Sequence, residues 1–166
     1  MNEFDAPSSA TFAPFAEVSP PQGQRLSQAM DRLYHCCGQR HDYLSQKYGL
    51  PPAELRCLLL FGAERYLTPK GVAARLGIAK SRVTKLVEGL VRRELVRKVP
   101  DPEDSRVTLL TLTPAGQRTR EAITATMAVL REAVLKHIEP SRREAILESL
   151  EALTTCMEGM GAVLED

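Results

Sequence analysis

The side chains best suited to bind another molecule gather in one short segment of this 166-residue chain. Arginine and lysine donate hydrogen bonds to guanine edges and to phosphates, and the hydroxyls of serine and threonine reach bases or backbone. The spacing predicts a helix whose apolar residues face inward and whose polar residues form an exposed edge near the N-terminus. The candidates for DNA contact on this edge are Lys80, Ser81, Arg82, Thr84 and Lys85.

Charge is distributed unevenly along the chain, although the formal net charge is only +1. The segment from Thr68 to Val99 holds nine basic and two acidic residues, a local charge of +7, whereas residues 1–24 and 139–166 are both acidic. Such a concentration of positive charge favours a polyanionic partner for the segment. From charge alone, a solvated helix surface is the alternative.

A second cluster contains two histidines and two cysteines: His35, Cys36, Cys37 and His41. Cys37 and His41 are four residues apart on a predicted helix and could share a soft metal, but two ligands do not make a site. The alternative is that Cys37 belongs to an apolar stripe. Cys57 and Cys156 are expected to pack as small hydrophobic residues. We therefore expect no metal and no cofactor.

The motifs of common enzymes are not found in the sequence, which has no Ser-His-Asp order, paired carboxylates, phosphate loop or zinc-protease spacing. We expect no enzymatic activity.

The longest apolar run, 57–61, is far shorter than the roughly 20 residues of a membrane span. No Lys or Arg precedes Arg25, so a secretory signal is not expected, and the protein is predicted to be cytoplasmic without a membrane partner.

A helix-turn-helix is predicted around the basic segment. Thr68 followed by Pro69 is typical of a helix N-cap with proline at the first helical position. Gly77 permits a turn, and a second helix is expected from about Lys80 to Arg93.

A β-hairpin is predicted next, with strands at 95–99 and 106–112 around a polar tip, 100–105. The acidic residues of the tip would repel phosphates, but Arg106 argues the other way. The carboxylate of Asp104 can hold Arg106 and direct it into a narrow, electronegative minor groove. The alternative is a solvent-exposed ion pair worth well under ~1 kcal/mol.

Long amphipathic helices are predicted at 25–48, 114–138 and 141–164. Ser141 and Glu144 have the spacing of a capping box for the last one. A central hydrophobic helix is expected from Pro52 to about Arg65. The apolar stripes of the long helices exceed what a small module can cover, which favours a homodimer. A monomer whose terminal helices wrap its own core is the alternative.

Five phrases of the sequence carry a resemblance: Leu67-Thr68-Pro69, Gly77 to Val87, Leu95-Val96-Arg97-Lys98, Asp101 to Arg106, and Leu112-Thr113-Pro114-Ala115-Gly116. Together they resemble the MarR family of bacterial transcription regulators. Residues 1–24 lie outside the resemblance, and their four prolines and lack of a sustained apolar period predict a flexible arm. The resemblance implies a MarR-like domain at 25–166, with the winged helix-turn-helix at about 52–112. It also implies a homodimer that binds a pseudo-palindromic, double-stranded operator as a repressor and responds to a small-molecule effector. Arg106 would be the minor-groove arginine and Asp104 its support.

Two positions depart from the family pattern. Ala79 stands where a capping residue is common, and Glu94 replaces the usual glycine, which loses the easy left-handed end of the helix.

By the same resemblance, a crevice for phenolic or aromatic acids could be lined by Tyr34, His41, Arg56 and Arg65. Two alternatives remain: a metal- or redox-responsive regulator of the same fold that uses Cys36, Cys37 and His41, and a winged-helix adaptor that does not bind DNA.

Overall fold

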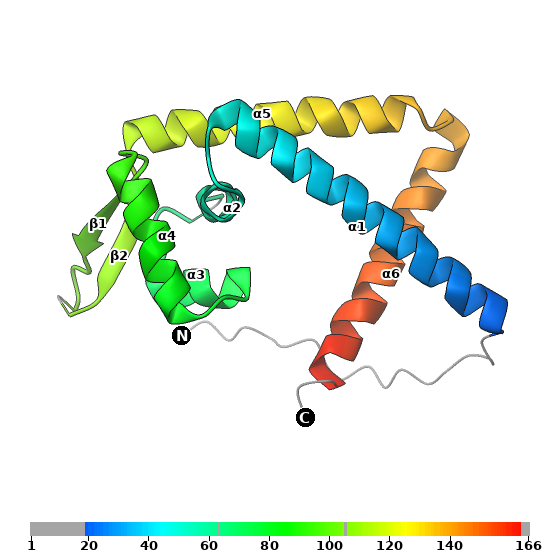
Figure 1. The fold of residues 1–166 in the computed structure, drawn as a ribbon, viewed down its shortest axis with the longest axis horizontal. Coiled ribbons are helices and arrows are strands. Elements are labelled where there is room, and N and C mark those ends of the chain that lie inside the picture. Colours follow the sequence, from blue (N-terminus) through cyan, green and yellow to red (C-terminus); the bar gives the residue numbers. More distant parts are fainter. Residues whose placement is uncertain (1–18, 63, 105, 164–166) are drawn as a thin grey trace. The chain divides into compact units, whose positions relative to one another are not determined.

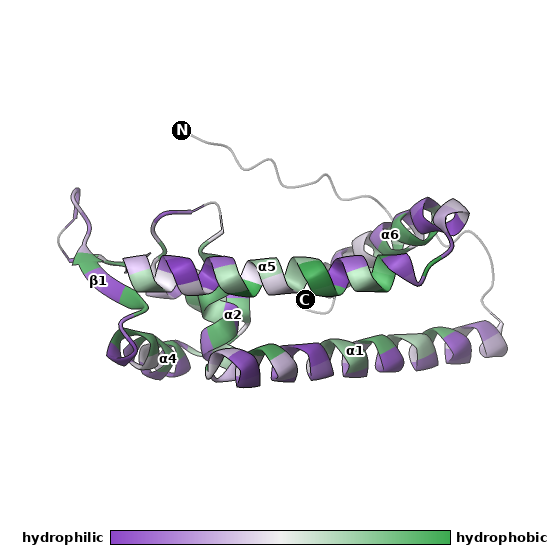
Figure 2. Ribbon diagram, turned by 90° about the horizontal axis from the view of Figure 1, so that it is seen from above, coloured by the Kyte–Doolittle hydropathy of each residue, from purple (hydrophilic) through white to green (hydrophobic). Residues whose placement is uncertain are grey.

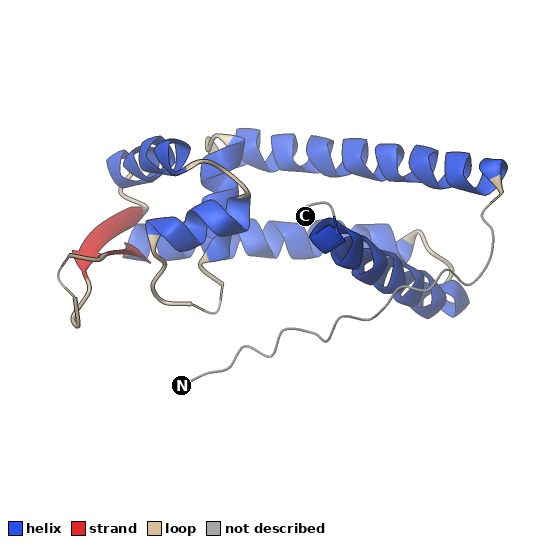
Figure 3. Cartoon of the chain, turned by 90° about the horizontal axis from the view of Figure 1, so that it is seen from below, coloured by secondary structure: helices blue, strands red, loops and turns tan. Residues whose placement is uncertain are grey.

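The protein is mostly helical with a single two-stranded hairpin in the part that the computed structural model describes, residues 19–62, 64–104 and 106–163 (Figures 1 and 3). The predicted fold class, mostly α with a β-hairpin wing, is confirmed. In chain order the elements are α1 (Pro20–Tyr48), α2 (Pro52–Leu60), α3 (Pro69–Leu76), α4 (Lys80–Arg92), β1 (Val96–Pro100), β2 (Thr108–Leu112), α5 (Pro114–Lys136), the short 3-10 helix η1 (Pro140–Arg142) and α6 (Arg143–Val163).

The described residues divide into two compact units, one from Met30 to Leu130 and another that contains residues before and after it. The hydrophobic core lies in the first unit, where α2, α3, α4, both strands and parts of α1 and α5 contribute to it. Its buried residues are Leu44, Leu50, Leu55, Cys57, Leu58, Phe61, Leu67, Val72, Val83, Leu86, Val87, Leu90, Leu95, Val96, Leu110 and Ile123.

The helix-turn-helix forms where the sequence predicts it. The hydroxyl of Thr68 accepts a hydrogen bond from the backbone N–H of Gly71 at 3.0 Å and caps α3. Gly77 ends α3 with a φ of 61°, a left-handed conformation that suits a residue without a side chain. Helix α4 begins after Ala79, which offers no side-chain cap.

The end of α4 closes in a left-handed turn even though no glycine is present. Glu94 has a φ of 57°, which costs about 1–2 kcal/mol for a residue with a side chain. Leu95 donates its N–H to the Leu90 carbonyl at 3.0 Å, and Glu94 donates to Val91 at 2.9 Å. These two bonds form a Schellman motif. The left-handed helix end, which the missing glycine was expected to remove, therefore still forms at Glu94.

The hairpin is antiparallel, with Val96 opposite Leu112 and Pro100 opposite Thr108. Leu67 pairs with Leu110 and adds a short bridge to the outer side of β2. The chain then enters α5, where the hydroxyl of Thr113 accepts from the N–H of Gly116 at 2.9 Å, as the Thr-Pro signal predicts.

Helix α2 is shorter than predicted, because it ends at Leu60 and not near Arg65. Gly62 follows, and the guanidinium of Arg120 donates to the carbonyls of Phe61 and Gly62. Arg120 thus satisfies carbonyl groups that would have no partner at a helix end.

The two outer helices also begin at other residues than predicted. Helix α1 starts at Pro20, five residues before the expected start. Gln22 Oε1 accepts hydrogen bonds from the N–H of Ser19 at 3.1 Å and from its hydroxyl at 2.8 Å, which is one half of a capping box. The remaining predicted arm, 1–18, lies outside the described residues. The capping box predicted at Ser141 is wrong, because Pro140 has already opened the η1 turn and the Ser141 hydroxyl donates to Glu139.

Several large apolar side chains on the long helices are exposed in the single chain: Leu26 and Leu33 on α1, Val129 and Val134 on α5, and Leu147, Leu150 and Met157 on α6. Figure 2 shows hydrophobic stretches along α5 and α6. No described residue of α6 is buried.

The described helices also lack a stretch with the length and hydropathy needed to cross a membrane.

Gly116→Ala is expected to destabilise the fold by about 1–3 kcal/mol, because a Cβ at this position would overlap the backbone carbonyl of Leu95, which cannot move independently. Gly38→Ala is the matched control, since its Cβ would meet no atom within 4 Å. This control should stabilise the helix by about 0.5–1 kcal/mol. Urea unfolding of both variants measures the difference, and equal effects would contradict the close contact.

Candidate nucleic-acid interface

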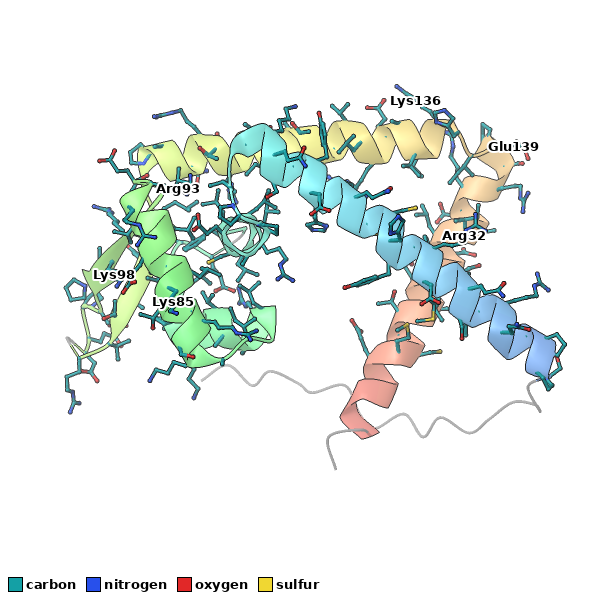
Figure 4. All side chains as sticks on the ribbon, in the orientation of Figure 1. Arg32, Lys85, Arg93, Lys98, Lys136 and Glu139 are labelled. Carbon is teal, nitrogen blue, oxygen red and sulfur yellow. The ribbon has the colours of Figure 1, made fainter. Side chains whose placement is uncertain are left out.

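Helix α4 separates apolar from polar residues on two faces. Val83, Val87 and Leu90 are buried, and Leu86 is only 7 % exposed. The five residues predicted to contact DNA are all exposed: Lys80, Ser81, Arg82, Thr84 and Lys85. Figure 4 shows Lys85 on α4 and Lys98 on the neighbouring hairpin. The helix therefore presents the predicted polar edge to solvent.

The N-terminus of α4 is electropositive for two reasons. Its first turn contains Lys80 and Arg82 and no acidic residue. In addition, Ala79 accepts no hydrogen bond through its side chain, so the first N–H groups of the helix and its dipole remain available to an anion.

The hairpin tip holds Arg106 in the geometry that the sequence predicts. Asp104 Oδ1 accepts from Arg106 Nε at 3.0 Å, and Asp104 Oδ2 accepts from the terminal nitrogen at 3.3 Å. The backbone N–H of Arg106 also donates to Asp104, at 3.1 Å. With its side chain 89 % exposed, Arg106 projects into solvent while its guanidinium is oriented by a carboxylate.

The acidic residues of the tip are partly occupied by the hairpin itself. Asp101 accepts hydrogen bonds from the backbone N–H groups of Glu103, at 2.8 Å, and Asp104, at 3.4 Å. Asp104 is paired with Arg106. Two of the three acidic side chains are therefore engaged locally, which weakens the repulsion expected from sequence.

An ion pair between helices, not found by sequence reasoning, fixes α4 against α2. Glu54 is nearly buried, and its Oε2 lies 2.9 Å from Arg93 Nε. Its carboxylate rests on Gly89, where a Cβ would lie 2.9 Å from Glu54 Cδ. In the sequence, the one indication of this contact was Gly89, a small residue on the buried face of α4.

Three of the four predicted effector-binding residues come together. Tyr34, His41 and Arg56 line a cavity of about 330 Å³ between α1 and α2. His41 Nδ1 lies 2.9 Å from the carbonyl of Cys37, which leaves its other ring nitrogen available to a ligand. Arg65 lines a different cavity.

The cysteines differ in exposure. Cys57 is buried as predicted, and burial, followed by the charge of Glu54, raises the pKa of its thiol to about 12. This thiol stays protonated and unreactive at neutral pH. Cys36, Cys37 and Cys156 are exposed in the single chain. Within the described ranges, His, Cys, Asp and Glu side chains form no group of three or more that could hold a metal.

Comparison with known proteins identifies the helix-turn-helix and wing. Residues 48–107 match the sequence model of the MarR family. No curated protein matches the chain.

Solved structures share the fold over most of the chain. A MarR family protein from Bacillus stearothermophilus is 20% identical, with a TM-score of 0.78 over 86% of this chain and 99% of its own. FabT from Streptococcus pneumoniae in complex with DNA is 18% identical, with a TM-score of 0.73 over 82% and 98%. MepR, a transcription regulator of the Staphylococcus aureus multidrug efflux pump MepA, is 19% identical, with a TM-score of 0.69 over 79% and 97%.

The carboxyl group of Asp104 should titrate below its ordinary pKa of 3.8, because the Arg106 side chain and then the Arg106 backbone N–H stabilise the charged form. The pair is complete above pH 3.8 and is lost as the pH falls through the lower, folded-state pKa. Carboxyl ¹³C shifts followed against pH measure this pKa. Arg106→Ala should return it toward 3.8, and an unchanged midpoint would rule out the pair.

Proposed function

We propose that this protein is a regulator, not an enzyme, that binds double-stranded operator DNA, because residues 48–107 match the sequence model of the MarR family and the chain shares the fold of a solved MarR family protein. We further propose that it binds a pseudo-palindromic site as a homodimer, represses transcription and responds to a small-molecule effector.

The exposed polar edge of α4 is the observation that carries the proposal. A helix fits the major groove, where arginine and lysine read guanine and where serine and threonine reach bases or phosphates. Lys80, Arg82 and Lys85 are exposed on this helix, opposite its buried face. An adaptor that binds only proteins has no need for such a basic edge.

Arg106 extends the contact to the minor groove. A guanidinium held by two oxygens of Asp104 loses less side-chain freedom on binding than an unrestrained one. The narrow minor groove of A·T-rich DNA has an enhanced negative potential that attracts arginine. Arg106 therefore reads the shape of the duplex beside the groove that α4 occupies.

The exposed apolar residues of the long helices support a homodimer. Leu150 and Met157 are 43% and 47% exposed, so removing the exposed part of each side chain from water stabilises an assembly by roughly 1 kcal/mol. A second copy of the chain supplies a matching apolar surface, and a two-fold axis then presents two α4 helices to one duplex.

The cavity beside Tyr34, His41 and Arg56 is the proposed effector site. It combines an aromatic ring with a cationic group, which suits a small aromatic acid. Arg65 lies outside this cavity and is not needed by this part of the proposal.

Operator fragments recovered by selection of bound genomic DNA should bind with a log–log salt slope of about −5, as expected for about six neutralised phosphates per dimer. Reversing charge with Arg82→Glu and Lys85→Glu should lower affinity by at least about tenfold and reduce the slope by about four, because each substitution occurs twice in the dimer. Fluorescence anisotropy at several salt concentrations measures both quantities.

Arg118→Glu is the control for charge reversal, because Arg118 is exposed and belongs to α5, not to α4 or the hairpin. It should leave affinity nearly unchanged. Equal binding by the double variant and the wild type would favour the adaptor. Footprinting should show two protected half-sites about 34 Å apart, one helical turn.

The double variant Leu150→Glu and Met157→Glu should sediment as a monomer and lose operator binding, because two charges would enter the proposed apolar interface. Thr155→Glu places one charge on the opposite side of α6 and should remain a dimer. Analytical ultracentrifugation distinguishes the two states. A wild-type chain that sediments only as a monomer would contradict the dimer.

A further inference from the structure

A cavity of about 460 Å³ in the unit from Met30 to Leu130 is lined by three arginines on three separate segments. Arg65 lies between α2 and α3, Arg97 is on β1 and Arg120 is on α5. Thr111 and Gln117 add side chains that can donate hydrogen bonds to the lining. This cavity shares no lining residue with the proposed effector site between α1 and α2.

The walls of the cavity are tied together by hydrogen bonds. Leu67 and Leu110 exchange two backbone bonds, at 3.0 and 2.7 Å, which join the segment after α2 to β2. Arg120 donates to the Gly62 carbonyl at 3.0 Å and joins the same segment to α5. Arg97 stands opposite Thr111 in the hairpin register. The cavity is therefore formed before any ligand binds.

The charge of this cavity is not balanced within the described residues. Glu64 is the one acidic residue in its lining, and its carboxylate pairs with Arg75 of α3, which is not in the lining. Arg120 donates to carbonyl oxygens only, and its buried Nε has no hydrogen-bond partner among the described residues. None of the ion pairs formed by described residues includes Arg65, Arg97 or Arg120.

We propose that this cavity binds a compact oxyanion with more than one negative charge, such as a phosphate ester or a tricarboxylate. Guanidinium groups match the paired oxygens of phosphates and carboxylates, and three of them exceed what a monoanion can neutralise. The volume lies in the range of small-molecule sites. A phosphate of the DNA backbone is a second source of the same chemistry, and the experiment separates the two.

Calorimetric titration of the DNA-free, full-length protein with citrate and with pyrophosphate, at constant ionic strength, tests the proposal. We expect saturable binding at one site per chain for both probes and much weaker binding of acetate. Arg65→Gln and Arg97→Gln should each weaken binding by about tenfold or more, because each removes a charged donor. Arg118→Gln, an equal change of charge on α5 outside the lining, should have no more than about a twofold effect.

Thermal unfolding confirms that each variant is folded before titration. Absence of saturable binding by both probes, or equal losses in Arg97→Gln and Arg118→Gln, would overturn the proposal. If Arg97→Gln weakens operator binding while the wild type binds neither probe, the cavity holds backbone phosphate and the proposal of a free anion fails. Because the titration contains no DNA, its outcome is independent of whether the protein binds an operator.

Discussion

The burial of one face of α4 is the constraint on which the candidate interface depends. Val83, Leu86, Val87 and Leu90 recur at helical spacing and pack among α2, α3 and β1. Each such side chain stabilises the fold by roughly 1.5–3 kcal/mol when buried, so the rotation of the helix about its axis is fixed by several of them together. A rotation by one residue, 100°, would replace buried valine and leucine with Thr84 or Lys85. The exposure of the basic edge is a consequence of this packing.

The position of the wing follows from how α4 ends. Leu90 and Leu95 are buried on either side of the turn, and the hydroxyl of Thr113 donates to the Glu94 carbonyl. These interactions offset the cost of about 1–2 kcal/mol for the left-handed conformation of Glu94. The close approach of Gly116 to the Leu95 backbone then fixes the start of α5 against the same turn. The hairpin that carries Arg106 is thereby anchored at its base to two helices.

Features set by neighbouring residues were predictable from sequence. The caps at Thr68 and Thr113, the turn at Gly77 and the pairing of Asp104 with Arg106 each depend on residues two or three positions apart. The spacing of Ser19 and Gln22 was also present in the sequence, but the proline-rich composition of residues 1–24 favoured a flexible arm.

Contacts between distant residues were not predictable in this way. Arg120 reaches a carbonyl 59 positions away, and this contact, with Gly62, ends α2 before the residue that helical periodicity indicates. The pairing of Glu54 with Arg93 likewise depends on how two helices cross, which periodicity does not define. The same reason explains why Arg65 was grouped with Tyr34 and His41: residue type indicated a ligand site, but only the fold assigns a residue to one cavity or another.

The uneven charge of the chain bears on how it would meet a duplex. A net charge of +1 gives little attraction at long range, whereas electrostatic screening at physiological salt acts over about 8 Å. Each segment therefore interacts with a polyanion largely through its own charge. The basic segment of +7 is attracted at contact, while the acidic chain ends are repelled. At the wing tip, Asp101 and Asp104 are engaged by the hairpin itself, so Arg106 can approach a groove that free carboxylates would avoid. This distribution favours one orientation on DNA over general adhesion to it.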